Sequence, residues 1–176
     1  MAGPGERPLR LVIRTDGAAR GNPGPASCGA VLFDAARTDA HDPAGQPFAV
    51  LARALGVRTN NVAEYAGLVL ALREARRLGA FEVELLLDSK LVVEQLNRRW
   101  RVKDSKLKGL FEEAQRHLAS FRSWSAVHEP RERNHAADAL ANLALDDPAA
   151  AALAIAAVAR RNGREPRSED AAGPPP

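Results

Sequence analysis

The order of strand-like and helical segments along this chain predicts an α/β fold with a five-stranded mixed sheet and helices on both of its faces. Two observations support this prediction. Three strand-like segments come first and are joined by short links, as in an antiparallel meander. Helical segments then alternate with two further strand-like segments, so the expected order is βββαβααβα, followed by one more helix.

The strands are recognised by alternation, β-branched content and flanking turn residues. Residues 9–15 (LRLVIRT) alternate and contain β-branched side chains, and residues 83–87 (VELLL) form a short apolar run typical of a buried strand. Glycine and proline in residues 21–25 (GNPGP) indicate a turn after the first strand. The expected strands are residues 9–15, 28–33, 48–57, 83–87 and 124–128.

Capping residues indicate where helices begin. Asn61 is a candidate N-cap with Glu64 three positions later, which is the capping-box spacing, and Gly79 is a suitable stop. Asn134 is a second candidate cap, and Asp147 followed by a proline predicts the start of an alanine-rich helix. The expected helices are residues 61–79, 89–97, 106–121, 134–145 and the alanine-rich 146–162.

Composition sets limits on the class of protein. The 176 residues suffice for one domain with a full core, expected at residues 9–145, and the ends at 1–8 and 163–176 have the composition of disordered tails. The single cysteine, Cys28, has no disulfide partner, which suits a reducing cytoplasm. No secretory signal is evident, and the most apolar run is too short to span a bilayer. We therefore expect a cytoplasmic monomer with no membrane contact. Its net charge of +3 permits a polyanionic partner without requiring one.

Four carboxylates stand beside predicted strand ends and helix starts: Asp16, Glu64, Asp88 and Asp138. Each has a simpler explanation, respectively as a turn residue, a capping-box partner, a helix N-cap and a first-turn charge favoured by the helix dipole. Four unrelated placements of this kind in one small domain are less probable than a single site to which all four carboxylates contribute. Oxygen ligands from separate elements are what Mg²⁺ requires, and two such ions form a phosphodiester-cleaving site. Mn²⁺ suits the same donors.

Short polar groups near these acids are candidates for contacts with sugar and phosphate. They are Gly17, Asn22, Thr59, Asn60 and Asn61. Downstream, a basic stretch surrounds one tryptophan, which fits a nucleic-acid backbone contact or, equally, a solvated loop. Its candidate binding residues are Arg98, Arg99, Trp100, Arg101 and Lys103.

Taken together, the segments TDGAARGNPGP, RTNNVAEY, LLLDS and RNHAADALAN resemble type 1 ribonuclease H over roughly residues 9–145. The resemblance implies a ribonuclease H-like fold and hydrolysis of the RNA strand of RNA–DNA hybrids, leaving 3′-hydroxyl and 5′-phosphate ends. It also implies that the four carboxylates bind metal and that Asn22 and residues 59–61 contact the substrate. Contacts to the 2′-hydroxyl would distinguish RNA from DNA, and no base-reading helix is evident, so cleavage should be largely independent of sequence.

The chain departs from the family in two places. The basic handle that many members insert is absent or reduced to residues 98–108, which implies either a lower hybrid affinity or an affinity that rests on residues 98–103 alone. The segment HEPRERN stands where many members have a mobile histidine loop, and it resembles a subgroup with a PRExN loop. Arg131 is the favoured catalytic assistant there, with His128 as the alternative.

Two rival functions are open from the sequence. One is another nuclease on the same fold, and the other is a hybrid-binding module with weak or no turnover. The NNxxE helix start argues for hybrid recognition over the first, and the presence of all four acids argues for turnover over the second.

Overall fold

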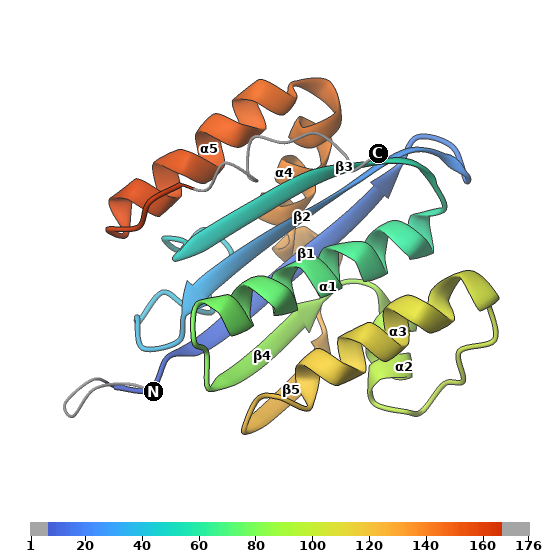
Figure 1. Ribbon diagram of the computed structural model, residues 1–176, viewed down its shortest axis with the longest axis horizontal. Helices are drawn as coiled ribbons and strands as arrows, with labels where there is room; N and C mark the ends of the chain where they lie inside the picture. The colour runs from blue at the N-terminus through green and yellow to red at the C-terminus, as the bar shows by residue number, and fades with distance from the viewer. Residues whose placement is uncertain (1–6, 167–176) are drawn as a thin grey trace.

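The chain folds around a five-stranded sheet of order β3-β2-β1-β4-β5, seen in a computed structural model that describes residues 7–166 (Figure 1). The strands are β1 (Arg10–Ala19), β2 (Gly24–Asp34), β3 (Ala49–Arg58), β4 (Glu82–Leu87) and β5 (Ser123–His128). β1 pairs antiparallel with β2 and β2 with β3, whereas β1 pairs parallel with β4 and β4 with β5. The predicted mixed sheet is confirmed.

Helices cover both faces of this sheet, as predicted (Figure 1). One face carries α1 (Asn60–Arg77), with α2 (Lys90–Leu96) and α3 (Ser105–Leu118) beside it. The other carries α4 (His135–Asp146) and α5 (Pro148–Arg161), and a 3₁₀ turn, η1 (Arg131–Arg133), leads into α4. Most of the expected tails, residues 1–6 and 167–176, lies outside the described residues.

The core has two layers because the central strands are buried on both faces. Leu11 and Ile13 pack toward α1 and α3, while Val12 packs with Ile155 and Val158 of α5 on the other face. A strand covered on both sides tends to contain a continuous apolar run, and in β1 that run is limited to residues 11–13, between Arg10 and Arg14.

Several predicted boundaries are wrong. β2 begins at Gly24 and not at Cys28, and α3 ends at Leu118 and not at Phe121. β1 does not stop at Thr15 but continues to Ala19, because its antiparallel pairing with β2 persists beyond the last pair with β4, Thr15 with Leu87. α1 is capped by Thr59, whose hydroxyl accepts a hydrogen bond from the Val62 amide, and not by Asn61. Glu64 therefore does not stand at the capping-box position.

Within the described part of the chain, the structure contains no helix with the length and apolar character needed to cross a membrane.

Candidate active site

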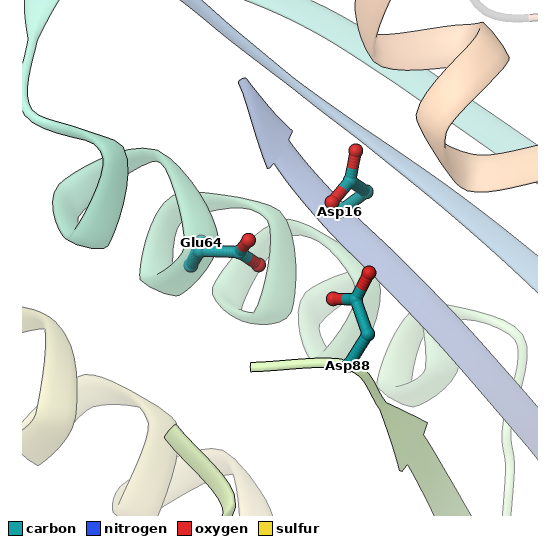
Figure 2. A group of neighbouring side chains, drawn as sticks. All are labelled: Asp16, Glu64 and Asp88. Carbon is teal, nitrogen blue, oxygen red and sulfur yellow. The ribbon is translucent and has the colours of Figure 1, made fainter. Parts of the chain in front are cut away.

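Three of the four predicted carboxylates converge at one edge of the sheet (Figure 2). Asp16 lies on β1, Glu64 on α1, and Asp88 directly follows β4. Each offers an oxygen atom, and these atoms all lie within 4.8 Å of one another. Asp16 and Glu64 are buried and Asp88 is half-buried.

The sheet and a glycine contact produce this convergence. β1 and β4 are parallel neighbours, and their pairing ends with Thr15 opposite Leu87. Asp16 and Asp88 directly follow these two residues in the chain, so they lie side by side. Gly17 lets α1 approach β1 closely: a Cβ at Gly17 would lie 2.2 Å from the Glu64 amide nitrogen. Only a residue without a side chain permits that approach.

Burial and like charge make the three acids electrostatically costly without a counterion. Burial, followed by the charges of Asp88 and Asp138, raises the pKa of Asp16 to about 7. Burial, followed by the charges of Asp16 and Asp88, raises the pKa of Glu64 well above its ordinary value. The Arg131 guanidinium opposes both pKa shifts. Oxygen donors held this close suit a hard divalent cation, which would offset their repulsion.

The fourth carboxylate, Asp138, lies beside this trio. It is in the first turn of α4, its charge contributes to the raised pKa of Asp16, and it lies 3.7 Å from Nη2 of Arg131. α4 reaches the sheet over Gly29, where a Cβ would lie 2.4 Å from the Ala137 carbonyl oxygen. Asp138 is partly exposed, with 39% of its side chain accessible, so it borders the cluster on the open side.

The simpler explanations of Asp16 as a turn residue, Glu64 as a capping-box partner and Asp88 as a helix cap are excluded. Asp138 does lie in the first turn of α4, as its simpler explanation required. Ser89, not Asp88, caps α2 by accepting a hydrogen bond from the Val92 amide. Asn134 occupies the cap position of α4, but its side chain makes no capping bond there. Its Nδ2 donates instead to the Thr15 carbonyl oxygen at 2.8 Å.

The polar groups predicted to contact substrate gather at the start of α1. The Asn22 carboxamide oxygen accepts a hydrogen bond from the Asn60 amide at 3.0 Å, so the loop after β1 is tied to this helix start. Thr59 and Asn61 lie on either side of Asn60, and Gly17 lies beneath the same helix. The structure thus brings all five predicted residues to the edge that holds the carboxylates.

The basic stretch lies apart from the carboxylates, in the loop between α2 and α3. Trp100 is 46% exposed, with the Lys90 ammonium 6.0 Å from the centre of its ring. Arg99 is held by Glu94, whose carboxylate accepts two of its hydrogen bonds at 2.7 and 3.0 Å. A groove of about 680 Å³ runs along this loop. Its lining includes Arg98, Arg99, Trp100, Arg101 and Lys108 but not Lys103.

His128 and Arg131 differ in what they face. His128 ends β5, and its Nε2 contacts the Asp88 carbonyl oxygen at 3.2 Å. Arg131 lies in η1, is 80% exposed and faces Asp138.

One residue near the site was not predicted from the sequence: Arg14, a buried arginine on β1 two positions before Asp16. Arg14 could have been noticed in the sequence because it is a charged residue directly after the apolar residues 11–13 of a predicted strand.

Known proteins resemble this chain over most of its length. The family model described as reverse transcriptase-like matches residues 14–144. The bifunctional protein Rv2228c of Mycobacterium tuberculosis is 45% identical over 148 residues, which cover 84% of this chain and 39% of that protein. Ribonuclease HI of Halobacterium salinarum is 43% identical over 142 residues, which cover 81% of this chain and 67% of that protein. The chain thus spans about two fifths of the mycobacterial relative.

Solved structures agree in fold. The N-terminal RNase H domain of Rv2228c, solved as a fusion with maltose-binding protein, has a TM-score of 0.72 at 45% identity and covers 83% of this chain and 98% of that one. LC11-RNase H1 in complex with an RNA/DNA hybrid has a TM-score of 0.69 at 37% identity and covers 77% of this chain and 96% of that one. With the acidic cluster formed by β1, α1 and the residue after β4, these matches show that the chain belongs to the type 1 ribonuclease H family.

Proposed function

We propose that this chain is a metal-dependent endoribonuclease that hydrolyses the RNA strand of RNA–DNA hybrids. The observation that carries the proposal is the convergence of three carboxylates within 4.8 Å, two of them buried, in a chain of this family. A site built only for binding a polyanion would be lined with cations, because buried carboxylates repel phosphate. We assign the catalytic unit to residues 9–145.

The acids suit a divalent metal, and we propose Mg²⁺, with two ions bound and Mn²⁺ as a substitute. Asp16, Glu64, Asp88 and Asp138 would supply the oxygen ligands. When bound, the ions would supply an activated water and charge neutralisation at the scissile phosphate. The carboxylates would hold and orient these ions, with Asp16 and Glu64 doing so from buried positions.

Other residues would hold the hybrid. Gly17, Asn22 and residues 59–61 lie at the same edge as the carboxylates, and they would contact the sugar-phosphate backbone and the 2′-hydroxyls of the RNA strand. The groove of the basic stretch would take a neighbouring backbone segment, with Arg98, Trp100 and Arg101 as its contacts and Arg99 held by Glu94. Lys103 lies on the same loop outside the groove lining and would contribute through its charge. Cleavage would leave 3′-hydroxyl and 5′-phosphate ends and depend little on sequence.

Arg131 is the proposed catalytic assistant, and the PRERN segment that contains it would place the chain in the PRExN subgroup. Its exposed guanidinium faces Asp138 and opposes the rise in the pKa of Asp16 and Glu64, so its charge acts at the cluster where a phosphate would bind. His128 is the weaker candidate because its ring contacts a backbone carbonyl. We further propose that the protein acts as a cytoplasmic monomer.

A cleavage assay tests the function. The chain should cut the RNA strand of a labelled hybrid when Mg²⁺ is present, and leave duplex DNA and duplex RNA intact. Asp88→Asn should abolish cutting while circular dichroism shows a folded protein, because that carboxylate lies at a strand end outside the core. Binding of the hybrid without cutting would instead identify a binding module, and cutting of duplex DNA would identify another nuclease.

A further inference from the structure

Arg14 is a fully buried charge close to the carboxylates. Its side chain is 1% exposed and is among the largest fully buried side chains of residues 7–166. It lies on β1 two residues before Asp16, so both side chains leave the same face of the strand. A buried guanidinium costs free energy unless its hydrogen bonds are satisfied, and an apolar side chain would fill the same volume without that cost. Packing alone therefore does not explain an arginine here.

The partners of Arg14 all lie outside β1. Its Nη1 donates to the Glu129 carboxylate at 2.5 Å and to the Arg133 carbonyl oxygen at 3.2 Å. Its Nη2 donates to the His41 carbonyl oxygen at 3.1 Å, in the loop between β2 and β3. One guanidinium thus joins the centre of the sheet to two loops that are distant in sequence.

These contacts fix the segment that carries Arg131. Glu129 and Arg133 lie two residues before and two residues after Arg131, and both are held by Arg14. Asn134 is held one residue further along β1, through the Thr15 carbonyl oxygen. The backbone is therefore anchored on both sides of Arg131, while the Arg131 side chain itself is exposed and points to Asp138.

We infer that Arg14 is a positioning residue, which acts through Glu129 and Arg133 to hold Arg131 opposite Asp138 at the carboxylate cluster. The inference rests on the proposed function, specifically on the proposed assistance of Arg131. An exposed arginine has many rotamers, so the position of its guanidinium depends on where its backbone is fixed. A misplacement of about 1 Å can cost about 10²-fold in rate.

The primary test is Arg14→Met, which keeps length and apolar bulk but removes the donors. We expect kcat on a labelled hybrid with Mg²⁺ to fall by about 10- to 100-fold, with KM changing less than about two-fold. Arg10→Met is the matched control: Arg10 lies on the same strand and forms an ion pair with Glu82 at 2.7 Å, far from the carboxylates. It should behave like the unmodified protein.

A double-mutant cycle separates positioning from general stability. If Arg14 acts through Arg131, then Arg14→Met should cause little further loss in an Arg131→Ala background. If the two losses multiply, Arg14 is merely structural and the inference is overturned. If Arg14→Met does not fold, Glu129→Gln replaces it in the double-mutant cycle with Arg131→Ala. That substitution keeps the side-chain shape but removes the negative charge that accepts the Arg14 hydrogen bond.

The outcomes also separate this inference from the proposed function. Full activity of Arg131→Ala would overturn the inference, since nothing would need positioning, while hydrolysis of the hybrid would still stand. Absence of metal-dependent cutting by the unmodified protein would overturn the proposed function itself.

Discussion

Asp16 is the residue whose pKa shows most directly the effects of burial and of neighbouring negative charge at this site. It is 5% exposed and adjoins Glu64, Asp88 and Asp138, so its ionised form is opposed by burial and by like charge together. In the folded protein its pKa is about 7, against 3.8 in the unfolded chain. The folded state therefore binds more protons than the unfolded state between these two values, and stability must fall as the pH rises through that interval.

Asp16→Asn should remove this penalty. In metal-free buffer the variant should gain stability relative to the unmodified protein as the pH rises from 4 to 7, with no further gain above the upper value. Thermal melts at intervals of pH would show the gain, at about 2–4 °C in Tm for each kcal/mol of repulsion removed. A constant difference between the two proteins across this range would show that Asp16 does not titrate as described.

Glu64→Gln should separate the metal role from helix capping. Thr59 caps α1, so loss of the Glu64 charge should leave the free energy of unfolding unchanged or higher, yet remove most activity. Thr59→Ala, in contrast, should cost about 1 kcal/mol of stability. Chemical denaturation and hybrid cleavage would be measured on both variants, and a destabilised but active Glu64→Gln would return Glu64 to a structural role.

At the scale of elements, local patterns predicted the order and type of strands and helices but not where several of them begin or end. The extension of β1 to Ala19 depends on pairing with β2, and the pattern of residues 9–15 contains no sign of that partner. Three consecutive residues, 59–61, are all good caps, and the choice among them is set by where β3 ends, at Arg58.

The candidate site was also only partly predictable, because local patterns reveal individual residues but not their partners in distant segments. Asp88 can be found from sequence because the apolar run of residues 83–87 ends directly before it. Asp16 was found because the apolar part of β1 ends near it, although the strand itself continues to Ala19. The anchoring of Asn134 on Thr15, and of Glu129 on Arg14, joins residues far apart in the chain, so no local window contains both partners.

The loop between α2 and α3 gives a prediction at the same scale. Neutralising Arg98, Arg101 and Lys103 should weaken hybrid binding and lower the slope of log affinity against log salt by about 1 for each phosphate that these side chains no longer neutralise. Arg99→Gln is the internal control, since that guanidinium is already held by Glu94 and should contribute little. Titrations of binding at several salt concentrations would measure the slopes, and equal slopes in both variants would mean that the loop is only solvated.

At the scale of the whole molecule, the site joins the two helical layers to the sheet between them. Glu64 comes from the helical layer on one face, Asp138 from the layer on the other, and Asp16 and Asp88 from the sheet between them. A cation bound by these groups would therefore link all three layers, and binding should be visible in global stability.

Mg²⁺ should accordingly raise Tm. At about 100 times its dissociation constant a ligand adds about 2.7 kcal/mol, which corresponds to about 5–10 °C in a domain of this size. The rise should be largely lost in Asp16→Asn and retained in Asp39→Asn, where the altered acid forms a surface ion pair with Arg37. An equal rise in all three proteins would indicate non-specific binding of the ion.

The glycine contacts that bring α1 and α4 against the sheet also bear on the kinetics of folding. The carboxylates come from elements spread over most of the chain, and they become neighbours only when both helices have docked over Gly17 and Gly29. If docking follows the rate-limiting barrier, repulsion among the acids is absent from the transition state. Relief of that repulsion, by a cation or by Asp16→Asn, would then slow unfolding and leave the folding rate unchanged.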